Sequence, residues 1–317
     1  MPQVQKSQVL NFLWLNLDLP AKPDPEDGSI RKPLPDEYIE NVREAGRRHP
    51  NAEIDFWVDS KRLTEKQLVY LKAVTELDLP NVHIKDLRTI PAYNKEKLYN
   101  EGETNSNWRS GWSGKIWLQV DAAKILISLQ GDFDQSFFAD LDHAHLDIES
   151  KQVQGMLGNH GLLIGSASEK YIGIENQLWG FERRQRVFFE KYYKAALGSA
   201  YKGQNGFADL VNMADHFKDG EKRTWWGGTK HVAVPISKIC LPIGSKGLEH
   251  AEQPGHEWSG AETYGREKKS PAVIPPAALA AAFNAAAARK IAVQAPTPAA
   301  ASSGGAGQKP HGWCPPF

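Results

Sequence analysis

Two acidic residues one position apart, Asp140 and Asp142, follow directly after an apolar stretch at residues 137–139. In an extended chain alternate side chains share a face, so the two carboxylates would point the same way while Leu141 points into the core. Carboxylates at the end of a buried strand are costly unless something positive neutralises them. Mg²⁺ and Mn²⁺ prefer carboxylate oxygens and usually share their coordination shell with phosphate oxygens. The pair alone also fits a solvated acidic turn, so the choice between a metal site and such a turn depends on the surrounding elements.

The elements that would position this pair alternate between strands and helices. Thr64 begins one helix, Asp36 is a good N-cap for an earlier one, and a third helix covers residues 115–129. This alternation predicts an α/β fold with a mostly parallel sheet covered by helices on both faces. In such a sheet ligands bind beyond the carboxyl ends of the strands, where the acid pair would lie. Segments with the composition of strands lie at residues 9–15, 54–58, 81–87, 137–142, 161–165 and 232–236.

The composition changes from about residue 268 onward, where Ala, Pro, Ser and Gly dominate. Residues 277–290 are nearly all alanine, which forms only a marginal helix in isolation. We therefore expect a catalytic domain at residues 1–267 and a flexible low-complexity tail at residues 268–317.

The overall composition is that of an ordinary soluble globular protein. The chain carries 38 Lys and Arg against 38 Asp and Glu, so nothing suggests electrostatic capture by nucleic acid or anionic lipid. Cys240 and Cys314, its two cysteines, form neither a disulfide framework nor a thiolate metal site. No signal peptide or transmembrane segment is evident. These features predict a soluble protein of a reducing cytosol, without a nucleic-acid partner.

Six short segments match one known pattern in order and approximate spacing. They read NFLW at residues 11–14, PLPDEYIEN at 33–41, HP at 49–50, FWVDS at 56–60, DAAKIL at 121–126 and DLD at 140–142. Together they resemble the sugar transferases with a DXD motif, which include the large clostridial glucosylating toxins and related bacterial effectors. The resemblance covers roughly residues 8–180.

The resemblance implies a GT-A fold with a Rossmann-like sheet, a nucleotide-sugar donor (usually a UDP-sugar) and a Mn²⁺ or Mg²⁺ ion. It implies that Trp14, next to Leu13, stacks on the uracil ring, and that Asp121 binds donor hydroxyls. Asp140 would bind the ribose or sugar and the metal, and Asp142 the metal directly. This is sound chemistry, because a cation on both phosphates neutralises the charge that develops on a nucleoside diphosphate leaving group.

The sequence departs from the family at two places near the proposed site. Lys124 stands where the family usually has arginine three residues after the helix aspartate, and it offers a point charge instead of a bidentate fork. Residues 131–136 replace a shorter glycine turn before the acid pair. Both departures bear more on the placement of the sugar hydroxyls than on the metal.

Two later segments would complete the site. Residues 175–181 resemble the family's segment on the acceptor side of the donor sugar, which places Asn176 in the catalytic set with Asp121 and Lys124. A plain N-cap of the following aromatic helix is the alternative role for Asn176. In the family a loop with a tryptophan closes over the diphosphate. We predict His256 and Trp258 for this role, with Trp225 and Trp226 as the alternative.

Three functions remain open at this point. The first is a retaining glycosyltransferase that acts on a protein or another acceptor and resembles a bacterial effector or toxin. The second is a metal-dependent hydrolase, which would use Asp140, Asp142, His143, His145 and Asp147. The third is a non-catalytic binding module on the same fold. The sugar and the acceptor do not follow from the sequence.

Overall fold

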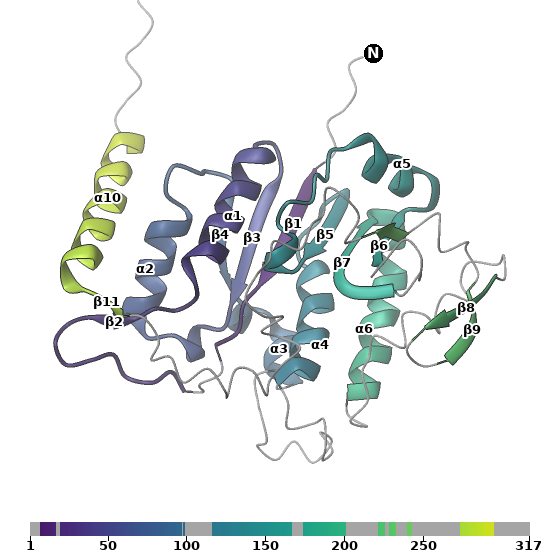
Figure 1. The fold of residues 1–317 in the computed structure, drawn as a ribbon, viewed down its shortest axis with the longest axis horizontal. Coiled ribbons are helices and arrows are strands. Elements are labelled where there is room, and N and C mark those ends of the chain that lie inside the picture. Colours follow the sequence, from purple (N-terminus) through teal and green to yellow (C-terminus); the bar gives the residue numbers. More distant parts are fainter. Residues whose placement is uncertain are drawn as a thin grey trace, which may run out of the picture.

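The computed structural model describes residues 7–16, 20–96, 98, 116–166, 174–200, 221–225, 228–232, 240–242 and 273–294. The centre of this part of the chain is a seven-stranded sheet with the order β10-β6-β7-β5-β1-β3-β4 (Figure 1). Its strands are β1 (Gln8–Leu13), β3 (Glu53–Val58), β4 (Val82–Asp86), β5 (Gln135–Ala139), β6 (Leu162–Ser166), β7 (Ile174–Glu182) and β10 (Cys240–Pro242).

Neighbouring strands run parallel except at β7, which is antiparallel to both β5 and β6. The α-helices are α1 (Asp36–Arg48), α2 (Glu65–Thr75), α3 (Pro91–Lys95), α4 (Ile116–Ser128), α5 (Lys151–His160), α6 (Arg186–Ala200) and α10 (Pro276–Gln294). The predicted fold class is confirmed: the protein is α/β, with a mixed, mostly parallel sheet flanked by helices.

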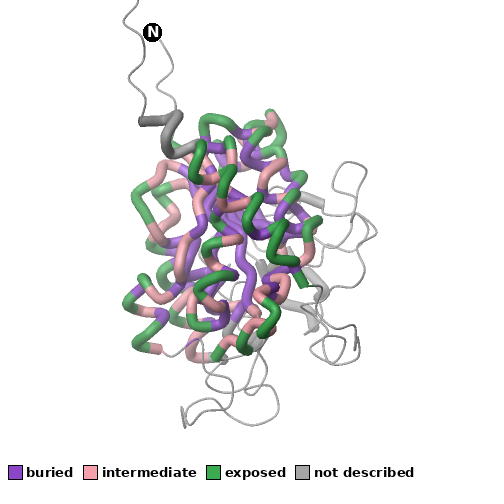
Figure 2. Tube along the Cα trace, turned by 90° about the vertical axis from the view of Figure 1, so that its left-hand side faces the viewer, coloured by how far each residue is buried: buried purple, intermediate pink, exposed green. Residues whose placement is uncertain are grey.

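Two hydrophobic clusters fill the space between the sheet and its helices, and buried residues run through the middle of the molecule (Figure 2). Phe12 and Phe56 face the helices α1 and α2, where they meet Val42. Trp57 and Phe138 belong to the opposite cluster, with residues of α4 and α6. Because strand side chains alternate between faces and nearly every position of β1, β3 and β5 is buried, the sheet is covered on both sides.

These elements confirm some of the local predictions and correct others. Thr64 is the N-cap of α2 and forms a capping box with Gln67, as predicted. The residue before α1 is Pro35 and not Asp36, which lies in the first helical turn. Strand β5 ends at Ala139, so the prediction of a strand that carries both acids is wrong. Of the strand predicted at residues 232–236, only Val232 is described, as the last residue of β9 (Gly228–Val232), which pairs with β8 (Glu221–Trp225).

Residues 273–294 pack on the rest of the fold, contrary to the expectation of a flexible tail. β11 (Val273–Ile274) pairs with β2 (Ile30–Arg31), and α10 lies against α2 (Figure 1). Leu279 and Ile274 form a small buried cluster with Ile30. The domain boundary after residue 267 stays a prediction. Among the described residues, no helix combines the length and apolar character that a membrane span requires.

Candidate functional site

The acid pair lies where β5 ends, at the carboxyl edge of the sheet. The backbone N–H of Asp140 donates to the carbonyl of Gln177 in β7, at 2.7 Å, and Leu141–His143 then form one turn of 3-10 helix. Asp140 is still extended, whereas Asp142 lies in the turn. The two side chains therefore do not share a strand face, but they remain close enough for the charge of Asp142 to act on Asp140.

Asp140 makes a two-point ion pair with Lys124 of α4. The Lys124 Nζ lies 2.8 Å from Oδ1 and 2.9 Å from Oδ2 of Asp140. Only 6% of the Lys124 side chain and 13% of the Asp140 side chain are exposed, so water screens this pair weakly. Asp121 lies three residues before Lys124 on the same helix and is half-buried. The structure thus brings the polar face of α4 to the acid turn.

The pKa of the Asp140 carboxyl is raised above its ordinary value. Burial is the main cause, and the negative charge of Asp142 acts in the same direction. The ammonium of Lys124 lowers this pKa, but it does not cancel the effect of burial. The positive charge of Lys124 therefore favours the ionised form of Asp140.

Lys124 is held in place by a chain of contacts on the sheet side of α4. Its Nζ lies 5.3 Å from the centre of the Phe138 ring, which stacks on Trp179 at 4.7 Å. The indole N–H of Trp179 donates to the Ser128 hydroxyl at 3.0 Å, and that hydroxyl donates to the Lys124 carbonyl at 2.8 Å. The last turn of α4 is thereby fixed to β5 and β7, and the ammonium is positioned over the acid turn.

The two residues predicted to hold the nucleotide are both buried. Trp14 is 3% exposed, its indole N–H donates to the carbonyl of Pro33 at 3.2 Å, and its ring lies 5.3 Å from that of Tyr38. Leu13 is also 3% exposed and packs on the other face of the sheet. The Trp14 ring therefore has no face open to a base in this structure, and its stacking role stays a prediction.

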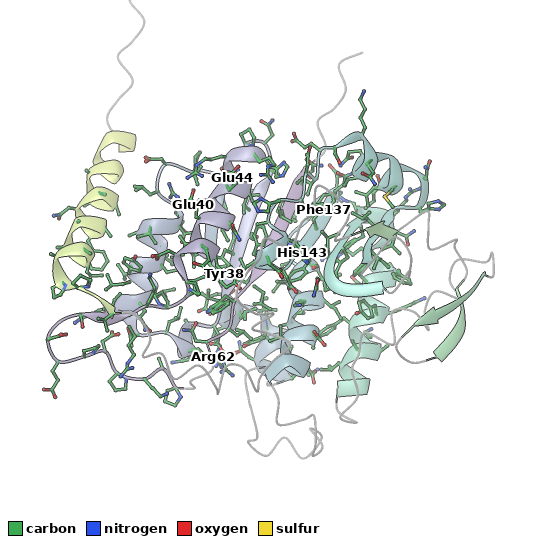
Figure 3. The ribbon with its side chains drawn as sticks, in the orientation of Figure 1. Tyr38, Glu40, Glu44, Arg62, Phe137 and His143 are labelled. Atoms are coloured by element: carbon green, nitrogen blue, oxygen red, sulfur yellow. The ribbon has the colours of Figure 1, made fainter. Side chains whose placement is uncertain are left out.

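The histidines next to the acid pair do not join it in a metal site. His143, labelled in Figure 3, is buried, and its Nε2 lies 2.7 Å from the Oε1 of Gln177. His145 is exposed. Within the described ranges, no group of three or more His, Cys, Asp or Glu side chains could hold a metal ion. The geometry gives no support to a hydrolase centre built from residues 140–147.

A divalent ion shared between protein and diphosphate needs only one or two carboxylates from the protein. Asp140 and Asp142 have the right chemistry for this, but Lys124 contacts both oxygens of Asp140. An ion held by this pair would therefore share Asp140 with the ammonium of Lys124.

Several predicted site residues lie outside the described part of the structure. His256, Trp258 and Trp226 belong to this group. The backbone of Trp225 ends β8, and that of Asn176 lies in β7, but their side chains are not described. Asn176 is therefore in a strand beside the acid turn and is not a helix N-cap.

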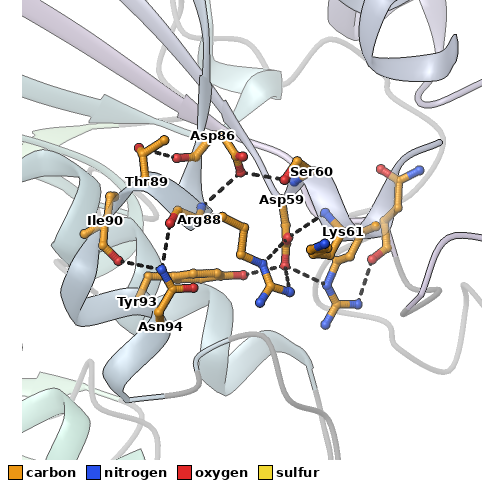
Figure 4. A network of polar contacts seen from close by, with 11 residues as sticks. Asp59, Ser60, Lys61, Asp86, Arg88, Thr89, Ile90, Tyr93 and Asn94 are labelled. Carbon is orange, nitrogen blue, oxygen red and sulfur yellow. Dashed lines mark hydrogen bonds and ion pairs between the residues drawn. The ribbon is translucent and has the colours of Figure 1, made fainter. Parts of the chain in front are cut away.

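A buried polar network that was not predicted from the sequence lies at the carboxyl ends of β3 and β4 (Figure 4). Its centre is the Asp59 carboxylate, which has no exposed surface and receives a hydrogen bond from Arg88 at 2.9 Å and from the Tyr93 hydroxyl at 3.0 Å. Arg62 lies 3.6 Å away and donates to the carbonyl of Asn16, just after β1. This network ties together the ends of three strands. A carboxylate directly after a buried strand was the signal, the same one that pointed to Asp140.

Gln177 was also missed as an individual residue. Its carbonyl accepts from the Asp140 N–H, and its side chain contacts His143, so it fixes both ends of the acid turn to β7. Its neighbour Asn176 was predicted instead, because residues 175–181 resemble the segment on the acceptor side of the family's site.

The matches found among known proteins are distant structural ones. No family model and no curated protein matches the chain. A solved structure described as a transferase matches with 13% identity and a TM-score of 0.42, over 66% of this chain and 84% of its own. The apo form of mouse xyloside xylosyltransferase 1 matches with 14% identity and a TM-score of 0.33, over 67% of this chain and 82% of its own. Because the sequence identities and TM-scores are this low, the function has to be argued from the site.

Proposed function

We propose that the chain is a glycosyltransferase that binds a nucleotide-sugar donor at the carboxyl edge of its sheet. The observation that carries this proposal is the contact between Lys124 on α4 and Asp140 at the end of β5. This contact brings together residues 121–126 and 140–142, two of the separate segments that carry the resemblance to the sugar transferases. A buried, ionised group next to a second carboxylate at a strand end is also typical of a functional site, because such an arrangement costs stability.

The roles proposed for the residues follow from their chemistry and position. Asp121 and Asp140 would accept hydrogen bonds from hydroxyl groups of the donor; Asp121 is on the same face of α4 as Lys124, three residues earlier, which supports this role. Lys124 would hold positive charge beside the diphosphate that leaves. Asp142, with Asp140, would hold a Mn²⁺ or Mg²⁺ ion, which supplies Lewis-acid stabilisation of the leaving diphosphate when bound. A UDP-sugar is the proposed donor, and a protein the proposed acceptor, with retention at the anomeric carbon.

The test is release of UDP from UDP-glucose, UDP-N-acetylglucosamine and UDP-galactose, with and without Mn²⁺. The Asp140→Asn and Asp142→Asn variants are each expected to lower the rate by about 10²-fold or more, because each removes charge that organises the reacting groups. Asp132→Asn is the matched control, since its side chain is 84% exposed and pairs with Arg183 away from the site. Unchanged hydrolysis in both site variants would reject the proposal. Tight UDP binding without turnover of any donor would instead favour a non-catalytic module.

A further inference from the structure

Lys124 occupies the carboxylate that the proposed metal ion would need. The ammonium contacts both oxygens of Asp140, and it is almost fully shielded from solvent. A solvated lysine could swing away at little cost, but this side chain packs over the Phe138 ring. Its helix turn is tied to Trp179 through Ser128. The contact is therefore a built feature of the site and not a chance surface pair.

The charges at the turn oppose the entry of a metal ion. His143 also lies at this turn, with its Nε2 3.9 Å from Oδ1 of Asp142. With His143 neutral and the other three groups ionised, Asp140, Asp142 and Lys124 carry one net negative charge. A divalent cation would reverse that sign and place two cations against one carboxylate in a site that water screens weakly. The negative charges of a diphosphate, at least two, would offset this excess of positive charge, and phosphate oxygens would supply ligands that the described residues do not.

We propose that Lys124 is a built-in counter-cation that excludes a divalent ion from Asp140 until a nucleoside diphosphate enters the site. The exclusion of the metal ion by Lys124 involves only residues of this chain. That a diphosphate removes this exclusion rests on the function proposed above. Metal and diphosphate then bind together, each raising the affinity of the other, as linkage between two ligands requires. An arginine at this position would keep the charge, so the behaviour depends on charge more than on geometry.

The experiment measures Mn²⁺ binding to the full chain from the electron paramagnetic resonance signal of free Mn²⁺. K124M keeps an unbranched side chain over Phe138, one atom shorter than lysine, and removes its charge. It is expected to bind Mn²⁺ alone at least about tenfold more tightly than the wild type, within the usual range of such couplings. K124R keeps the charge and is expected to bind as weakly as the wild type. The double variant K124M/D142N is expected to lose the gain, which assigns the ion to the acid turn. A folded K124M with wild-type affinity for Mn²⁺ would overturn the proposal.

A second measurement covers the case in which K124M does not fold, since that variant leaves the buried Asp140 without its cation. UDP is expected to raise the affinity of the wild type for Mn²⁺ at least about tenfold. D142N measured with the same UDP gives the baseline for Mn²⁺ held by UDP in solution. Equal Mn²⁺ affinity with and without UDP would overturn the proposal. A chain that binds no UDP by calorimetry would refute the proposed function, whereas the comparison of wild type and K124M with Mn²⁺ alone still tests Lys124.

Discussion

At the scale of single residues, Asp59 is expected to matter most for stability among the charged groups outside the proposed site. Its carboxylate is fully enclosed and contacts Arg88, Arg62 and the Tyr93 hydroxyl. Asp59→Asn removes the negative charge and leaves the guanidinium groups buried without it. The expected loss in the free energy of unfolding is about 3–5 kcal/mol, measured by urea denaturation.

The control for this prediction is an acid in an exposed ion pair. Asp36 pairs with Lys32, and its side chain is 69% exposed. Asp36→Asn is expected to cost less than about 1 kcal/mol, because solvent screens such pairs. Similar losses for the two variants would contradict the role assigned to the Asp59 network.

Asp55 on β3 gives a prediction about pH. Burial raises the pKa of its carboxyl, and Glu53 acts in the same direction, while Lys85 and His83 oppose the shift. A raised pKa in the folded state means that ionised Asp55 destabilises the fold above that pKa, and that this cost disappears below the ordinary value of 3.8. Asp55→Asn is therefore expected to raise the melting temperature at pH 7, with a difference from wild type that shrinks as the pH falls towards 4. A constant difference across this range would count against the assignment.

Residue types near the site could be predicted from the sequence, but their geometry could not. Asp121, Lys124, Asp140 and Asp142 were named from spacing and resemblance, and the structure brings Lys124 to Asp140. The shared strand face predicted for the two acids is wrong, because the chain turns into a 3-10 helix at Leu141, directly after the Asp140 N–H has bonded the carbonyl of Gln177, 37 residues later in the chain. Such a bond between distant segments leaves no local pattern in the sequence. The same holds for the burial of Trp14.

At the scale of elements, the strand β7 was the main omission. Its residues Glu175 and Asn176 were assigned to the approach of a helix, because polar residues before an apolar run also fit an N-terminus. The segment is a strand because β5 and β6 pair with it on both sides. Strand preference depends strongly on such neighbours, which a single sequence does not reveal.

The centre of β7 carries a glycine that the packing requires. Gly180 lies opposite Phe137 of β5, and a Cβ at this position would come within 2.5 Å of the Phe137 ring. Phe137 is fully buried and stands three residues before Asp140, so the ring cannot yield without disturbing the acid turn. Gly180→Ala is expected to cost about 1–3 kcal/mol in the free energy of unfolding, measured by chemical denaturation.

A glycine with open space around it provides the comparison. Gly155 lies in α5, and a Cβ there would meet nothing within 4 Å. Gly155→Ala is expected to stabilise the fold by about 0.5–1 kcal/mol, because alanine is the better helix former. If both substitutions shifted stability in the same direction, the close packing of Gly180 against Phe137 would be refuted.

At the scale of the whole molecule, the alanine-rich segment changes from an expected tail into part of the fold. An isolated helix of this composition is marginal, and that argument from the sequence still holds. The composition of this segment does not reveal the surface on which it packs. That surface is formed by β2 and α2, some 200 residues earlier in the chain. Leu279 and Ile274 are buried there against Ile30, and Tyr70 and Phe283 pack around them.

The attachment of α10 can be tested by one substitution at its buried face. Leu279 is 8% exposed, so Leu279→Ala is expected to cost about 2 kcal/mol or more, through lost burial and the cavity that remains. Val273→Ala is the matched control, because Val273 is 53% exposed and its truncation should change stability by less than about 0.5 kcal/mol. Limited proteolysis gives a second readout, since a detached α10 would be cut faster in the Leu279 variant than in the control. If both variants matched the wild type in stability and cleavage, α10 would not be held by this cluster, and a flexible tail after residue 267 would again be the better description.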